Sequence, residues 1–199
     1  MGFSGLADIY LGWARGRFDK ATPVATSAVE YDPLCGYAHA MSAFCSSHAG
    51  KGKEAVQWGK AAIELEESFF TYWALQQAFH ADQQFAQAVA AGEMALALSG
   101  RHPFAMSGQA MIFAHWGKVA EAKALYAELA ARLASGYVPP THLAIAASAA
   151  GELDLAVEYV RQSFEIRDPM LMVARHWPDF DRLREDPRFG EILARMGLD

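Results

Sequence analysis

The sequence predicts an all-α fold, a solenoid of about five helix hairpins followed by a C-terminal capping helix. Alanine makes up about a fifth of the 199 residues, and this composition favours helices over disordered chain. Small residues also recur every 34 residues or so, which is the signature of a repeat architecture. No stretch alternates apolar and polar residues with a period of two, so strands are not expected.

Ladders of small residues define the hairpins. The first ladder is expected to end the first helix of each hairpin in a left-handed cap, and it comprises Gly16, Gly50, Gln83, Gly117 and Gly151. The second ladder lies five residues further along and comprises Ala21, Ala55, Ala88, Ala122 and Ala156. A third ladder follows seven residues later, on the same helix face, and comprises Ala28, Ala62 and Ala95. Small side chains at these positions allow antiparallel helices to approach closely.

In chain order, the ladders predict a single domain of five repeats, residues 2–33, 36–67, 69–100, 103–135 and 137–169. In the first repeat, the second helix should begin near Lys20, which places Pro23 in its first turn. Residues 170–199 form the capping segment. Its charged last helix has an apolar stripe, which comprises Leu183, Phe189, Ile192, Leu193 and Met196.

The pattern resembles the tetratricopeptide repeat (TPR), in which a small residue stands at the turn, an alanine begins the second helix and an aromatic residue lies late in the first. Phe79 and Phe113 fill the aromatic slot, whereas Gly12 and Ser46 depart from it. The tail, including Pro139-Pro140, resembles the C-terminal TPR arrays of multidomain bacterial signalling and regulatory proteins. This resemblance implies a right-handed α-solenoid whose first helices line a concave groove.

In the register of the alanine ladder, the resemblance implies a groove that is aromatic and nearly uncharged. Its predicted partner-binding residues are Tyr10, Trp13, Tyr37, Phe44, His48, Phe70, Trp73, Gln77, His80, Phe104, Met111 and His115. Two interpretations of these side chains stay open: they bind a partner, or they pack against one another in the core. The Lys, Arg and Asn residues with which some TPR proteins clamp a carboxylate are missing from these positions, so that subclass is not expected.

Charge and composition exclude several other functions. The formal net charge of −6 and the pI of about 5.6 argue against nucleic acid as a partner. No apolar stretch is long enough to span a membrane, and a cytoplasmic protein is expected. Cys35 and Cys45 are expected to be free thiols. His48, His80 and His115 belong to successive repeats about 10 Å apart, so neither a metal site nor a cofactor is expected.

The sequence therefore favours a non-catalytic scaffold that binds an apolar peptide or helix of a protein partner in the groove. A sensor that binds a small apolar ligand in the same groove is the alternative, and an enzyme with a substrate pocket in that groove is a third hypothesis. No catalytic residue is assigned. The first repeat opens directly into apolar residues, so we expect an upstream domain, more repeats or a second copy of the chain, as in a homodimer, to cover it.

Overall fold

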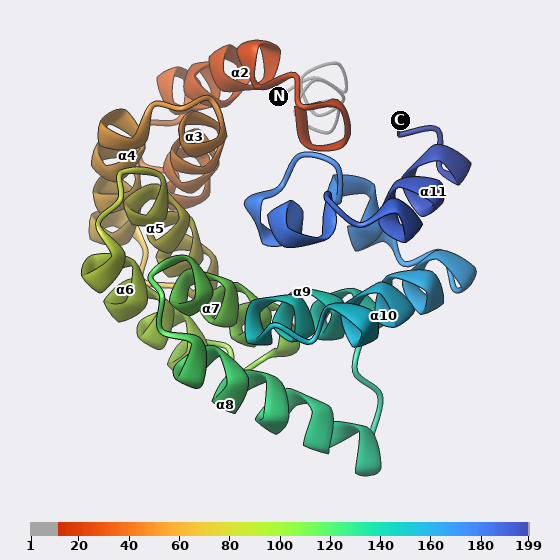
Figure 1. The fold of residues 1–199 in the computed structure, drawn as a ribbon. Helices are drawn as coiled ribbons and strands as arrows, with labels where there is room; N and C mark the ends of the chain where they lie inside the picture. Colours follow the sequence, from red (N-terminus) through yellow and green to blue (C-terminus); the bar gives the residue numbers. More distant parts are fainter. Residues whose placement is uncertain (1–11, 199) are drawn as a thin grey trace. The chain divides into compact units, whose positions relative to one another are not determined.

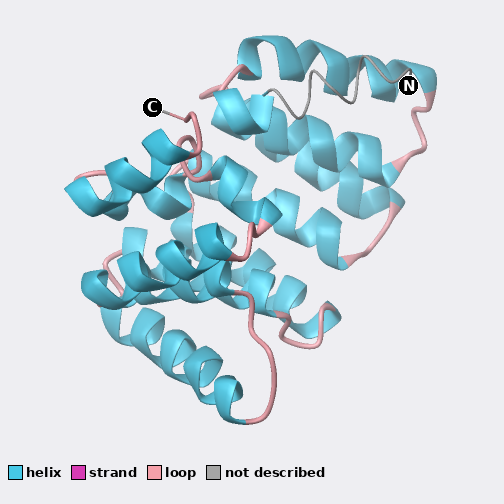
Figure 2. Ribbon diagram, turned by 90° about the vertical axis from the view of Figure 1, so that its right-hand side faces the viewer, coloured by secondary structure: helices cyan, strands magenta, loops and turns pink. Residues whose placement is uncertain are grey.

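The structure is a computed structural model, and it describes residues 12–198. Helices and loops make up this part of the chain, and no strand occurs in it (Figure 2). The prediction of an all-α fold is confirmed. The chain divides into two compact units, Met1–Arg101 and His102–Asp199.

The first unit is a series of antiparallel helices. After a short helical stretch at residues 12–15, its helices are α2 (Phe18–Tyr31), α3 (Gly36–His48), α4 (Gly52–Leu65), α5 (Phe69–Ala81) and α6 (Phe85–Leu98) (Figure 1). Each helix packs on the next one in the chain, and α3 also packs on α5. This arrangement makes α3 and α5 inner helices with neighbours on several sides.

One expectation about this unit was wrong in detail. Helix α2 begins at Phe18, not near Lys20, and Pro23 therefore lies inside the helix. The backbone N–H groups of Lys20 and Ala21 both donate to the carbonyl of Arg17, at 3.0 and 3.1 Å, and these bonds start the helix early. The proline ring is exposed, so it disturbs no packing.

The turns inside the hairpins share one backbone geometry. All five positions of the predicted ladder adopt a positive φ, 66° at Gly16, 75° at Gly50, 60° at Gln83, 80° at Gly117 and 87° at Gly151. After Gly50, Gln83, Gly117 and Gly151, the next residue also donates its N–H to a carbonyl five residues back, for example Gln84 to Phe79 at 2.8 Å. This is the Schellman cap, so the prediction of left-handed caps is confirmed.

The alanine ladder lies at the contact between helices. Its five members, Ala21, Ala55, Ala88, Ala122 and Ala156, each have no exposed surface. Ala28, Ala62 and Ala95 of the third ladder are also buried. A larger side chain at these sites would push two helices apart.

The second unit continues the same pattern. Its α-helices are α7 (Pro103–His115), α8 (Val119–Ala131), α9 (Pro140–Ala150), α10 (Leu153–Glu165) and α11 (Pro187–Arg195), with short 3₁₀ segments η1 (Arg132–Ala134), η2 (Pro169–Val173) and η3 (Pro178–Leu183). Helix α9 packs on α7, α8, α10 and η3, and every one of its residues is buried. It is the central helix of this unit.

The capping segment is less regular than one long helix. Proline disfavours helical geometry in the residue before it, so Pro187 separates η3 from α11. The Asp186 carboxylate then caps α11 by accepting a hydrogen bond from the Arg188 N–H at 2.9 Å. Leu183 and Phe189 are fully buried, so the segment covers the last hairpin, as expected, with its apolar side inward.

No helix among residues 12–198 is both long enough and apolar enough to cross a membrane.

Candidate interaction surface

A row of aromatic rings runs through the first unit. It starts at Trp13 and continues across α3 and α5. The ring centroids are 5.2 Å apart for Trp13 and Phe44, 5.1 Å for Phe44 and Trp73, 5.3 Å for Trp73 and Phe70, and 4.9 Å for Phe70 and Tyr37. These spacings are those of favourable aromatic pairs. We call these five residues the aromatic row.

The row passes from the interior to the surface. Phe44 has no exposed surface and Trp73 is 3% exposed, whereas Tyr37 is 57% exposed. Phe70 lies between these extremes, partly buried, and its ring is stacked on Tyr37. The inner rings thus hold the outer pair in a fixed position, and Tyr37 is the member of the aromatic row that falls in the exposed class.

His48 and Phe18 complete the packing around Phe44. The His48 ring centroid lies 4.2 Å from that of Phe44 and 4.9 Å from that of Phe18. Its Nδ1 lies 3.0 Å from the Phe44 carbonyl oxygen, and because a carbonyl only accepts, Nδ1 carries the proton. Burial lowers the pKa of His48 to about 4, against the smaller opposing effect of that hydrogen bond. His48 is therefore a neutral packing residue at pH 7.

The two cysteines of the first unit, Cys35 and Cys45, are both free thiols. Cys45 is fully buried, and burial raises the pKa of its thiol to about 12. The thiolate is the reactive form, so Cys45 acts as a small apolar side chain.

In the second unit, a buried polar pair joins α7 to α9. The Ser107 hydroxyl lies 3.0 Å from the Phe104 carbonyl, to which it donates, and 3.3 Å from Nδ1 of His142. The ring of Phe104 meets that of His142 edge-on at 5.5 Å. Burial lowers the pKa of His142 to about 4. Ser107 is only 2% exposed, so this pair fixes two helices and presents no nucleophile to solvent.

A second polar cluster ties α9 to the end of α10. The Thr141 hydroxyl donates to the Asp168 carboxylate at 2.6 Å and lies 3.0 Å from the Ser163 hydroxyl. Asp168 also accepts a hydrogen bond from the Met170 N–H at 3.0 Å and so begins η2. One carboxylate therefore sets the path of the chain into the capping segment.

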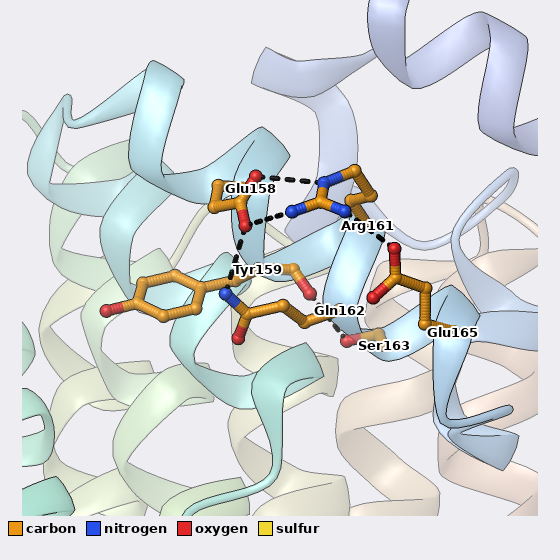
Figure 3. A network of polar contacts seen from close by, with 6 residues as sticks. All are labelled: Glu158, Tyr159, Arg161, Gln162, Ser163 and Glu165. Atoms are coloured by element: carbon orange, nitrogen blue, oxygen red, sulfur yellow. Dashed lines mark hydrogen bonds and ion pairs between the residues drawn. The ribbon is translucent and has the colours of Figure 1, made fainter.

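Helix α10 carries its own network on the exposed face, shown in Figure 3. Arg161 donates to Glu158 through Nη2 at 2.6 Å and to Glu165 through Nη1 at 2.6 Å. Gln162 adds a bond to Glu158 at 3.2 Å. Both carboxylates are thus already paired within the helix.

An apolar cavity of about 330 Å³ lies beside this helix. Its wall combines α10, η2 and the chain after α11, and is formed by Ser163, Phe164, Arg167, Asp168, Pro169, Leu171, Met172 and Met196. Its volume is at the lower end of the range for small-molecule sites.

The fold can be compared with known proteins. TTC0263, a TPR protein of Thermus thermophilus, superposes with a TM-score of 0.65 at 20% identity, over 96% of this chain and 99% of that chain. The chain has the TPR fold. A putative kinesin light chain with TPR-like repeats from Podosopora anserina gives a TM-score of 0.57 at 18% identity, over 83% of this chain and 94% of the other. Cut9, from the APC/C hetero-tetramer Cut9–Hcn1, gives 0.58 at 14%, over 96% and 42%.

At these identities the similarity concerns the fold alone. No protein-family model matches the sequence. No curated protein matches it either.

The TPR fold brings part of the predicted groove together. Trp13, Tyr37, Phe44, His48, Phe70 and Trp73 lie in one connected group of rings. Gln77 and His80 follow on α5, whereas Phe104, Met111 and His115 belong to the second unit. Tyr10 lies outside the described residues.

The predicted groove residues that the structure describes differ in burial: four are buried, and the others are partly or largely exposed. Phe44, Trp73, Gln77 and Met111 are 5% exposed or less, so core packing, the second of the two interpretations, describes these side chains. For His115, burial and the nearby Arg182 charge both lower the pKa. No group of three or more His, Cys, Asp or Glu side chains in the part of the chain that the structure describes is placed to hold a metal ion.

Several residues of these clusters were not among the predicted ones, and Phe18 and His142 are the aromatic ones. Phe18 begins a second helix, and the resemblance assigns groove positions only to first helices. His142 lies in the first turn of α9, the first helix of the fifth hairpin, at a position to which the resemblance assigns no groove residue. Neither residue carries a local signal, because each meets its partners through packing between helices.

Proposed function

We propose that this chain is a non-catalytic protein-interaction module that binds an apolar peptide or helix of a partner at the outer end of the aromatic row. The carrying observation is the stacked Tyr37–Phe70 pair, with Tyr37 57% exposed. Tyrosine and other aromatic residues anchor many interfaces, since they bury a large area at a low entropy cost.

The surroundings of the pair support this proposal. Tyr31 is 89% exposed and Leu34 is 78% exposed, and both precede Tyr37 by a few residues. Exposed apolar side chains that gather in one place mark interaction sites more often than single ones do. The buried rings of Phe44 and Trp73 hold the outer pair rigidly, which reduces the ordering cost of binding.

The TPR neighbours are consistent with such a role. One matching structure is Naa15/Naa10 bound to HypK-THB, with a TM-score of 0.53 at 16% identity over 98% of this chain and 34% of that chain. That structure is a complex of several proteins, and we propose only protein binding as such for this chain.

The test is a peptide selection against the full chain, with binding measured by isothermal titration calorimetry. We expect selected peptides to carry apolar anchors and to lose at least tenfold in affinity to Tyr37→Ala. Tyr137→Ala is the matched control, because Tyr137 is 74% exposed and lies in the second unit. Equal effects of the two substitutions, or no apolar peptide at all, would contradict the proposal.

The cavity beside α10 favours a second candidate, a sensor for a small apolar ligand, at a site other than the predicted groove. Phe164, Leu171 and Met172 provide its apolar wall. Thermal-shift screening of small apolar compounds tests this, with Met172→Trp designed to fill the space. A stabilising compound whose effect survives in that variant would place the ligand elsewhere.

A further inference from the structure

The outer end of the aromatic row lies where two loops between hairpins meet. One loop joins α2 to α3 and the other joins α4 to α5. An added Cβ at Gly36 would lie 2.8 Å from Cβ of Glu66, so the loops are in direct contact. The apolar side chains here are Tyr31, Leu34, Tyr37, Leu65 and Phe70, of which all but Phe70 are more than a third exposed. We call them the aromatic edge.

The aromatic edge is surrounded by negative charge. Five exposed carboxylates stand in the same two segments, and they are Glu30, Asp32, Glu64, Glu66 and Glu67. The chain has no Lys or Arg between residues 21 and 50, nor between 61 and 100. None of the five forms an ion pair with a Lys or Arg of the described chain.

Several carboxylates elsewhere in the protein form ion pairs. Asp19 pairs with Arg17 at 3.1 Å and Glu54 with Lys51 at 3.5 Å in the same unit. On α10, Arg161 engages two glutamates at once (Figure 3). The aromatic edge therefore combines uncovered apolar area with uncompensated charge of one sign.

We propose that the partner segment that docks on the aromatic edge is basic, with Arg or Lys side chains beside its apolar anchors. The proposal rests on the proposed function and specifies its partner. A guanidinium can lie over the exposed face of Tyr37 and form a fork of hydrogen bonds to Glu66 or Glu67. The uncompensated carboxylates also attract such a segment before contact.

Charge complementarity excludes the opposite kinds of partner. An acidic peptide or a nucleic acid backbone would bring like charge onto five carboxylates, which opposes binding. The attraction is screened beyond about 8 Å at physiological ionic strength. Salt should therefore weaken the basic peptide more than a neutral one.

The experiment uses fluorescence anisotropy with the full chain and three fluorescein-labelled 12-residue peptides. All three share Leu and Phe at the same helical positions, and their polar positions carry Arg, Gln or Glu. We expect the Arg peptide to bind most tightly. The double variant Glu66→Gln/Glu67→Gln should weaken the Arg peptide about 3- to 30-fold, as expected for two exposed charge pairs, and leave the Gln peptide unchanged.

A matched control removes the same charge elsewhere. Glu121 and Glu185 are exposed carboxylates of the second unit, so Glu121→Gln/Glu185→Gln should leave the Arg peptide unchanged. An equal loss in both double variants would show a general charge effect and overturn the proposal.

The remaining outcomes separate this proposal from the one on which it rests. If the Gln peptide binds as tightly as the Arg peptide and Tyr37→Ala weakens both, the basic partner is refuted and the interaction surface stands. If Tyr37→Ala changes neither affinity, or no peptide binds, both proposals fail. Circular dichroism of each variant verifies that the fold is retained.

Discussion

Replacing Phe44 by Ala tests whether the inner part of the aromatic row is core. Phe44 has no exposed surface and lies against Trp13, His48 and Trp73. Removing such a ring leaves a cavity and loses aromatic pairs, so we expect the free energy of unfolding to fall by about 3–5 kcal/mol. Phe44→Leu keeps part of the volume and should cost about 1–2 kcal/mol. Urea titrations followed by circular dichroism give both values.

Tyr37→Ala is the comparison within the same helix. Tyr37 keeps 57% of its surface exposed and stacks on Phe70. One exposed aromatic pair is worth about 0.5–1.5 kcal/mol, so the loss should be well below that of Phe44→Ala. Equal small losses would refute the reasoning, because they would show that Phe44 is a surface residue.

Three further predictions concern backbone space and protonation. Gly52→Ala should lower the free energy of unfolding by about 1–3 kcal/mol, because its Cβ would lie 2.8 Å from the Asp82 backbone. Gly50→Ala meets nothing within 4 Å and should lower it by about 1 kcal/mol for its φ of +75° alone. Equal urea midpoints of the two variants would contradict this prediction. The pKa values of His48 and His142 are lowered to about 4 in the folded protein, so the unfolded state binds protons more readily. Each histidine should therefore remove up to about 2 kcal/mol of stability between pH 7 and pH 5. A stability that does not change with pH in either the parent or His142→Gln would refute this prediction. Burial raises the pKa of Asp179 to about 6, so its contribution to stability is lost as pH rises from 3.8 through 6. Asp179→Asn should therefore be more stable than the parent at pH 7.5, and the difference should vanish near pH 4. An unchanged urea midpoint at pH 7.5 would count against this prediction.

The repeat could be predicted because the local backbone geometry or a close helix contact requires a small residue at each of its positions. A hairpin turn needs a left-handed residue, and even Gln83 adopts a φ of 60° in the slot that the ladder assigns to it. A close helix contact needs a small side chain, and Ala55 and Ala88 are fully buried for that reason. The capping segment was harder to predict, because Pro187 divides a continuous charged pattern into η3 and α11.

The sequence by itself determined the turns, the helices and the small-residue contacts, since all three depend on neighbours within a few positions along the chain. Tertiary structure alone decided which aromatic rings are core and which are surface. Tyr37 and Phe44 are seven residues apart on α3, and seven residues are about two helical turns, so periodicity places both on one face. What separates them is that Trp13 and Trp73 cover Phe44 from other elements, whereas Tyr37 stays more than half exposed at the helix end. Burial depends on residues distant in the chain, and spacing within one helix does not encode it.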